Sequence, residues 1–195
     1  TIVGTFYRQH RLTPPPPVAI CLCAGIISDT LHLTSPTKTI VDEEVLHWLA
    51  DVAQLDLDAF SADFFATGSL LKNYSPREAL ESDRKEFTEG QWKLCISQIE
   101  ELGLDEFWKC KEELAAVLEE VRTSNQLDFA CLMVTDINEN NSVLLTTESK
   151  PIEKAIEYPK ISKRLYELND VVSRKKQLFP YLSRLLSRIT PDHIE

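Results

Sequence analysis

The chain has 195 residues, enough for one large domain or two small ones, and 43% of them are apolar. Its formal net charge of -10 argues against non-specific binding to nucleic acid, which requires a basic face. The sequence shows neither a secretory leader nor an apolar run of about 18 residues, so we expect a cytoplasmic protein without a membrane partner.

The distribution of charge indicates the kind of ligand to expect, and the cysteines indicate whether disulfides or a zinc site are present. Residues 160–188 carry eight lysines and arginines against two acidic residues, which suits a small anionic ligand better than a polyanion. The cysteines are odd in number, form no CxxC pair and mostly have apolar neighbours, so buried thiols are expected rather than disulfides or a zinc site. They are Cys21, Cys23, Cys95, Cys110 and Cys131.

The first part of the chain is predicted to be helical. Apolar residues recur at helical spacing, and four consecutive prolines, 14–17, predict a stiff connector after the first helix. Asp42 is the predicted cap of the third helix. The first residues have the pattern of a helix already under way, which suggests a fragment of a longer protein. The predicted helices cover residues 2–11, 18–33, 42–53 and 56–71.

The second part alternates strands and helices. A polar, turn-like stretch at 72–76 is the predicted linker, and the turn 88–90 between two short runs predicts a β-hairpin. The fold class expected is therefore α/β, with a helical N-terminal segment followed by a mixed sheet covered by helices. The predicted strands are 85–87, 93–99, 129–134, 142–146 and one ending at 171–172; the predicted helices are 105–123, 151–158 and 178–186.

One carboxylate, Asp29, follows the long apolar run 18–27. Burying it is costly unless a metal, a cation or several donors compensate it, and the alternative is an exposed aspartate near the end of a helix. His32, three residues further on, could share a site with Asp29, although a structural role is favoured. The sequence contains no Gly-rich phosphate loop, HExxH or CxxC motif.

Three consecutive cations, Arg174, Lys175 and Lys176, follow two β-branched residues and precede an apolar helix. Mutual repulsion usually places such a run in a solvated turn. A strand end could instead project Arg174 and Lys175 into a cleft, where arginine offers a planar fork to phosphate oxygens and lysine a mobile point charge.

Four stretches of the sequence have a recognisable pattern. They are Ile26-Ile27-Ser28-Asp29-Thr30-Leu31 with Ser35-Pro36-Thr37, Asp83-Arg84-Lys85-Glu86-Phe87, Leu132-Met133-Val134-Thr135-Asp136-Ile137 and Val172-Ser173-Arg174-Lys175-Lys176-Gln177. Together they resemble the family-II, manganese-dependent inorganic pyrophosphatases of the DHH phosphoesterase superfamily, in order along nearly the whole chain. The resemblance implies the end of a DHH domain at 1–71, a linker at 72–76 and a DHH-associated substrate-binding domain at 77–195.

The resemblance also implies roles for single residues. Asp29 matches a metal ligand, and Lys85, Arg174 and Lys175 match phosphate-binding cations. The family's His-x-Asp-x-Asp and Asp-His-His motifs and its isolated aspartate are missing, and His32-Leu33-Thr34 stands where the family usually has Leu-Phe-Lys. We therefore expect one ligand for Mn²⁺ (or Mg²⁺ or Co²⁺) but no complete metal site in this chain.

The implied reaction is hydrolysis of pyrophosphate to two phosphates by a metal-activated water in the parent enzyme, with this chain inactive alone. Pyrophosphate or phosphate is the expected partner, and a homodimer is considered as an assembly. Two alternatives stay open: a short-chain exopolyphosphatase of the same superfamily, and a non-catalytic phosphate-binding or dimerisation module.

Overall fold

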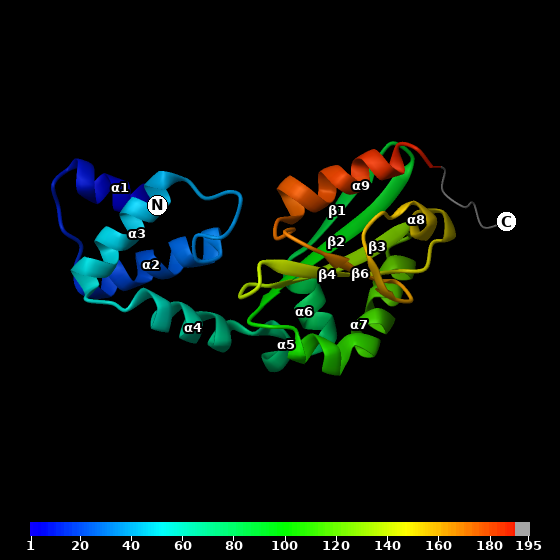
Figure 1. Ribbon diagram of the computed structural model, residues 1–195, viewed down its shortest axis with the longest axis horizontal. Coiled ribbons are helices and arrows are strands. Elements are labelled where there is room, and N and C mark those ends of the chain that lie inside the picture. The colour runs from blue at the N-terminus through cyan, green and yellow to red at the C-terminus, as the bar shows by residue number, and fades with distance from the viewer. Residues whose placement is uncertain (190–195) are drawn as a thin grey trace. The chain divides into compact units, whose positions relative to one another are not determined.

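The structure is a computed structural model that describes residues 1–189 (Figure 1). It divides into two compact units, Thr1–Gly68 and Ser69–Glu195. The first unit is helical and the second contains a mixed sheet with helices, so the predicted α/β class is confirmed. Within 1–189 no helix is both long enough and apolar enough to cross a bilayer.

The first unit is built around two packed helices, α2 and α3. α2 carries an apolar face with Ile26 and Ile27, which is buried, and α3 contributes the fully buried Val45 and Leu49. Pro16 is the first residue of α2, a position where proline is tolerated, so the prolines begin a helix as well as ending a connector. The helices are α1 (Ile2–Gln9), α2 (Pro16–Thr30), α3 (Ile40–Ala53) and α4 (Leu57–Gly68).

Thr39, rather than Asp42, is the N-cap of α3. The hydroxyl of Thr39 accepts a bond from the amide of Asp42, and the carboxylate of Asp42 accepts one from the amide of Thr39 at 2.6 Å. The predicted helix start was therefore three residues late. Asp42 takes part in the cap as the reciprocal member of a capping box.

Gly4 marks the closest approach of α1 to α3. A Cβ at this position would lie 2.5 Å from Cγ1 of Val45 and 3.3 Å from Cδ1 of Leu49. We expect Gly4→Ala to lower the free energy of unfolding by about 1–3 kcal/mol through overpacking. Gly25→Ala is the matched control, because nothing lies within 4 Å of that position in α2. It should raise stability by roughly 0.5–1 kcal/mol.

Urea unfolding of the two variants, followed by circular dichroism, checks this prediction. Equal stability of the two alanine variants would contradict the close packing of α1 on α3.

The second unit is a six-stranded sheet, within the described residues, in the order β1-β2-β3-β4-β6-β5. β2 and β3 run parallel, and the other neighbouring pairs run antiparallel. The strands are β1 (Arg84–Glu89), β2 (Trp92–Glu101), β3 (Phe129–Asp136), β4 (Asn141–Thr146), β5 (Lys160–Ser162) and β6 (Leu165–Leu168). The helices are α5 (Leu70–Asn73), α6 (Pro76–Ser82), α7 (Asp105–Ser124), α8 (Lys150–Ala155), the π-helix η1 (Arg174–Leu178) and α9 (Phe179–Leu186).

Helices cover both faces of this sheet (Figure 1). Alternate residues of each strand point to opposite faces, which gives two apolar cores. One core packs beneath α6 and α7, around Phe107 and Leu114. The other packs beneath α8 and α9, around Ile152 and Leu182. We call the second the α9 face of the sheet.

The structure differs from the sequence prediction in two segments. Residues 171–172, predicted to end a strand, are irregular and buried, while β5 and β6 were not predicted. The range 72–76, predicted to be a linker, begins in the last two residues of α5 and ends at the first residue of α6, and the division between units falls before it, after Gly68. The domain limits derived from the family resemblance stay a prediction.

Candidate anion-binding site

Two glutamine side chains hold the segment before α9 in an irregular conformation. Oε1 of Gln177 accepts bonds from the amides of Val172 and Ser173, at 3.0 and 2.9 Å. From β2, Gln98 donates to the carbonyl of Val172 at 3.3 Å and accepts from the amide of Arg174 at 3.2 Å. These bonds take the place of a strand ladder. They leave Arg174 as the first residue of the π-helix η1, a kind of helix often found at functional sites.

Arg174 is buried, with 6% of its surface exposed. Its Nη1 donates to the carbonyl oxygens of Asp83, at 2.5 Å, and Ile96, at 3.2 Å. Its Nη2 donates to Oδ1 of Asp83 at 2.9 Å. The protein therefore engages three of the five N–H donors of the guanidinium. The sequence had left open whether Arg174 lies in a solvated turn or projects into a cleft.

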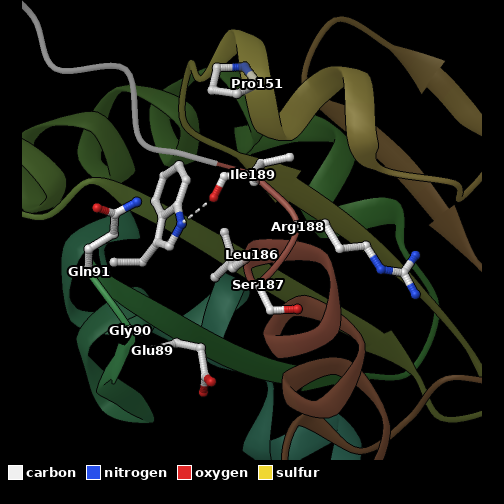
Figure 2. Close-up of a pocket in the computed structure, with 9 residues that line it drawn as sticks. Glu89, Gly90, Gln91, Pro151, Leu186, Ser187, Arg188 and Ile189 are labelled. Carbon is white, nitrogen blue, oxygen red and sulfur yellow. Dashed lines mark hydrogen bonds between the residues drawn. The ribbon is translucent and has the colours of Figure 1, made fainter.

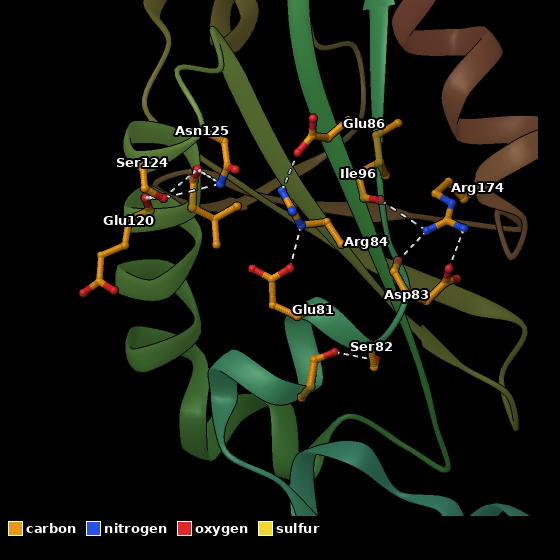
Figure 3. A network of polar contacts seen from close by, with 12 residues as sticks. Glu81, Ser82, Asp83, Arg84, Glu86, Ile96, Glu120, Ser124, Asn125 and Arg174 are labelled. Atoms are coloured by element: carbon orange, nitrogen blue, oxygen red, sulfur yellow. Dashed lines mark hydrogen bonds and ion pairs between the residues drawn. The ribbon is translucent and has the colours of Figure 1, made fainter.

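Figure 3 shows Arg174 and Arg84 turned to different sides of the β1–β2 pair. Arg84 forms ion pairs with Glu81 at 2.6 Å and Glu86 at 2.8 Å. Arg84 is paired in register with Ser97, whereas Arg174 reaches the carbonyl of Ile96. The Arg84 cluster is thus a separate structural network.

Lys85 lies on the same face of the sheet as Arg174. It is directly opposite Ile96, which is part of the core on the α9 face. Phe87, two residues further along β1, stacks on Phe179 of α9 with ring centroids 4.3 Å apart. Since residues two apart share a face, the exposed Lys85 extends from the strand next to the anchor of Arg174.

Lys175 follows Arg174 in η1 and is exposed. The polar residues near this segment come from the start of β4 and from the carboxyl ends of the parallel strands β2 and β3, where ligands commonly bind in α/β sheets. The hydroxyl of Ser142 donates to the carbonyl of Val171 at 2.5 Å and lies 3.0 Å from Oγ1 of Thr135. Desolvation, and then the charge of Asp83, raises the pKa of Glu100, while Arg174 opposes this change.

Sequence reasoning missed Asp83 and Gln98 as parts of this arrangement. Asp83 was within a quoted stretch, but its partner is 91 residues away. Gln98 was within the predicted strand 93–99 but was given no role in a site. Its place on the apolar α9 face, in phase with Trp92, Leu94 and Ile96, is the signal that could have found it.

Asp29 is exposed in the last turn of α2. Of the two alternatives that the sequence left open, the exposed aspartate is the one found, because the buried face of α2 is formed by its neighbours. A carboxylate there also faces the negative end of the helix dipole, which is mildly unfavourable. Within the described part of the chain, the carboxylate of Asp29 forms no side-chain hydrogen bond or ion pair.

The chain reverses after Asp29 through three left-handed residues, Leu31, His32 and Leu33, with φ of 46°, 49° and 64°. Such conformations are strained for non-glycine residues, and they concentrate at functional sites. Thr30 supports the turn: its hydroxyl accepts from the amide of Leu33 at 3.1 Å. Nε2 of His32 lies 3.7 Å from Oδ1 of Asp58 in α4, so His32 has a carboxylate partner other than Asp29.

The described residues do not fit a complete manganese site. Residues 1–189 contain no group of three or more His, Cys, Asp or Glu side chains placed to hold a metal ion. A divalent transition ion needs several oxygen or imidazole ligands, and Asp29 alone offers one carboxylate.

A cavity of about 870 Å³ lies elsewhere in the second unit (Figure 2). It is lined by the β1–β2 turn at Gly90, by Pro151 of α8 and by the residues that follow α9, including Ile189. The indole of Trp92 donates to the carbonyl of Ile189 at 3.4 Å beside it. Arg174 and Lys85 do not line this cavity, and its lining offers few ionisable groups.

The second unit thus combines a mixed sheet covered on both faces with an arginine-centred polar site at the carboxyl ends of its parallel strands. The model of the DHHA2 domain matches residues 62–185. The chain belongs to the DHHA2 domain family.

Similar proteins are named as inorganic pyrophosphatases. The manganese-dependent inorganic pyrophosphatase of Bacillus subtilis is 32% identical over 185 residues, which cover 94% of this chain and 60% of that protein. A Clostridium acetobutylicum protein named "Probable manganese-dependent inorganic pyrophosphatase" is 31% identical, with coverage of 94% and 59%. The chain therefore spans about three fifths of the length of these relatives.

A solved structure shares the fold. The Methanococcus jannaschii protein assigned to the family II inorganic pyrophosphatases superposes with a TM-score of 0.80 and 27% identity, over 95% of this chain and 63% of that one. The resemblance to family II pyrophosphatases seen in the sequence is confirmed.

Proposed function

We propose that the second unit binds the oxygens of pyrophosphate through Arg174, Lys85 and Lys175, and that the chain serves as part of a manganese-dependent inorganic pyrophosphatase. The observation that carries this proposal is the position of Arg174. Its guanidinium is anchored on the carbonyl of Ile96, the residue directly opposite Lys85. Two cations distant in sequence thereby share one face of the sheet.

The chemistry of these side chains suits a pyrophosphate anion. The two lysines carry mobile ammonium charges, and the two N–H groups of Arg174 not engaged by Asp83 and Ile96 remain for phosphate oxygens. Cations placed in this way neutralise the oxygens and stabilise the departing phosphate. Because Asp83 pairs with Arg174, the lysines supply most of the net positive charge.

The manganese dependence in the relatives' names leads us to propose Asp29 as one metal ligand. Its exposed, unpartnered carboxylate beside a strained turn supports this role. Residues 1–189 do not complete a metal site, so we assign no chemical step to a metal held by this chain. The other ligands would have to come from outside the described residues.

Calorimetric titration of the 195-residue chain with metal-free pyrophosphate tests the proposal. Lys85→Gln and Lys175→Gln should each weaken binding about five- to tenfold, since each removes one charge from the anion site. Lys93→Gln is the matched control: Lys93 is exposed on β2, in register with Thr88 and out of phase with the core of the α9 face. The pyrophosphate affinity of Lys93→Gln should stay within about twofold of that of the unmodified chain.

Equal losses in all three variants would indicate only a general effect of net charge, and would refute this site. A parallel titration with tripolyphosphate addresses the substrate. Binding of pyrophosphate at least as tight as that of tripolyphosphate is expected, and a strong preference for the longer anion would favour an exopolyphosphatase.

A further inference from the structure

We propose that Gln98 and Asp83 are positioning residues that hold Arg174 ready for the anion. Gln98 holds the backbone of Arg174, and Asp83 holds the guanidinium of Arg174. The inference rests on the proposed function and assigns two further residues to the same site. Neither residue needs to touch the anion, since each acts through Arg174.

Gln98 fixes where the η1 segment begins. Its carboxamide accepts from the amide of Arg174 at 3.2 Å and donates to the carbonyl of Val172 at 3.3 Å and to Oε1 of Glu100 at 3.1 Å. The bonds to Arg174 and Val172 satisfy two backbone groups that flank Ser173, as a neighbouring strand would. Because Gln98 is 9% exposed and emerges from the rigid β2 strand, its position is set by the sheet.

Gln98 is also unusual in its surroundings. Preceding residues of the same strand face, Leu94 and Ile96, are fully buried apolar core. A leucine or methionine would pack equally well there, whereas a buried amide is tolerated only when its donors and acceptor find partners. Those partners are chiefly the backbone of the cation-bearing segment, which points to a positioning role.

Asp83 fixes the other end of Arg174. Its carboxylate accepts from Nη2 at 2.9 Å, and its backbone carbonyl accepts from Nη1 at 2.5 Å. The side chain of Asp83 is about half exposed, while that of Arg174 is 8% exposed. The carboxylate therefore orients a buried fork and leaves its remaining edge for a ligand. An arginine ordered in advance loses less entropy when the anion binds.

Substitution of Asp83 distinguishes an effect of charge from an effect of positioning, because the two predict opposite changes in anion affinity. Removing a carboxylate beside an anion site should strengthen binding if charge alone matters. If Asp83 positions Arg174, Asp83→Ala should instead weaken metal-free pyrophosphate binding about fivefold, and Asp83→Asn, which keeps an acceptor oxygen, should recover most of the loss. Glu86→Ala is the matched control, because Glu86 lies three residues from Asp83, in β1, but pairs with Arg84.

Gln98→Met keeps the length and packing of the side chain and removes its hydrogen bonds. We expect about tenfold weaker pyrophosphate binding, measured by calorimetry on the 195-residue chain, with thermal unfolding monitored to show that the variant is folded. Asp83→Ala carries the test if Gln98→Met does not fold.

An Arg174→Ala background decides whether both residues act through Arg174. There the further effects of Gln98→Met and Asp83→Ala should fall below about twofold, as expected for residues that share one partner. Tighter binding by Asp83→Ala, unchanged binding by Gln98→Met, or undiminished effects in the Arg174→Ala background would each overturn this inference while leaving the proposed function intact. Unchanged binding by Arg174→Ala alone would overturn both.

Discussion

Replacement of Arg174 by alanine is expected to weaken metal-free pyrophosphate binding by about 100-fold. A hydrogen bond to a charged group contributes about 1.5–3 kcal/mol, and each 1.4 kcal/mol is a factor of ten in affinity. In the unmodified chain the carboxylate of Asp83 lies 2.9 Å from Nη2 of Arg174. The substitution leaves this carboxylate beside the anion without its partner. Lost attraction and new repulsion act in the same direction.

The affinity of Arg174→Lys should lie between those of the unmodified chain and Arg174→Ala, at about tenfold weaker binding. An ammonium keeps the charge but cannot reproduce the planar fork. Isothermal titration calorimetry with pyrophosphate measures the affinities of the unmodified chain and of both variants, and so their order. Arg84→Ala is the matched control: it removes an arginine that is anchored by Glu81 and Glu86 instead, so it should change affinity by less than about twofold. Equal effects of Arg84→Ala and Arg174→Ala would show that Arg174 has no special role.

The 195-residue chain by itself is expected to release no phosphate from pyrophosphate when manganese is added. The reason is the lack of metal ligands. Asp29 is the one proposed ligand, and residues 1–189 place no three metal-binding side chains together. Two-metal hydrolysis needs several ligands for each ion. Turnover should therefore stay at the level of a chain-free blank, at least about a thousandfold below an active enzyme at typical turnover rates.

A phosphate-release assay with the Bacillus subtilis relative as the positive control measures this. Asp29→Asn provides a second test. We expect the chain to bind manganese weakly through the exposed carboxylate, so binding followed by electron paramagnetic resonance should decrease when that carboxylate loses its charge. Turnover that requires manganese and disappears with a chelator would show that the chain contains a metal site of its own. Manganese binding that is unaffected by Asp29→Asn would contradict the proposed role of Asp29.

Much of the architecture was decided by local patterns in the sequence. The β-hairpin around Gly90, the helix that contains Phe107 and Leu114, and the buried strand Phe129–Asp136 follow from periodicity and turn residues within short windows. The cations at 174–176 also led to the prediction of an anion site, because they stand out in an acidic chain. Local signals were sufficient to identify these elements because turn residues and hydrophobic periodicity lie within one segment, even though β3 pairs with the distant strand β2.

The partners of those cations were decided only by the tertiary structure. Arg174 meets Asp83 across 91 residues and Gln98 across 76, and no local pattern encodes either contact. Neighbouring contacts explain why residues 171–172 form an irregular segment instead of a strand. The side-chain amides of Gln98 and Gln177 bond the backbone of Val172, and the hydroxyl of Ser142 bonds the carbonyl of Val171. The exposure of Asp29 likewise depends on which side of α2 packs against α3. Hydrophobic periodicity sets the elements, whereas the geometry of a polar site depends on which buried donors and acceptors the folded sheet brings within bonding distance.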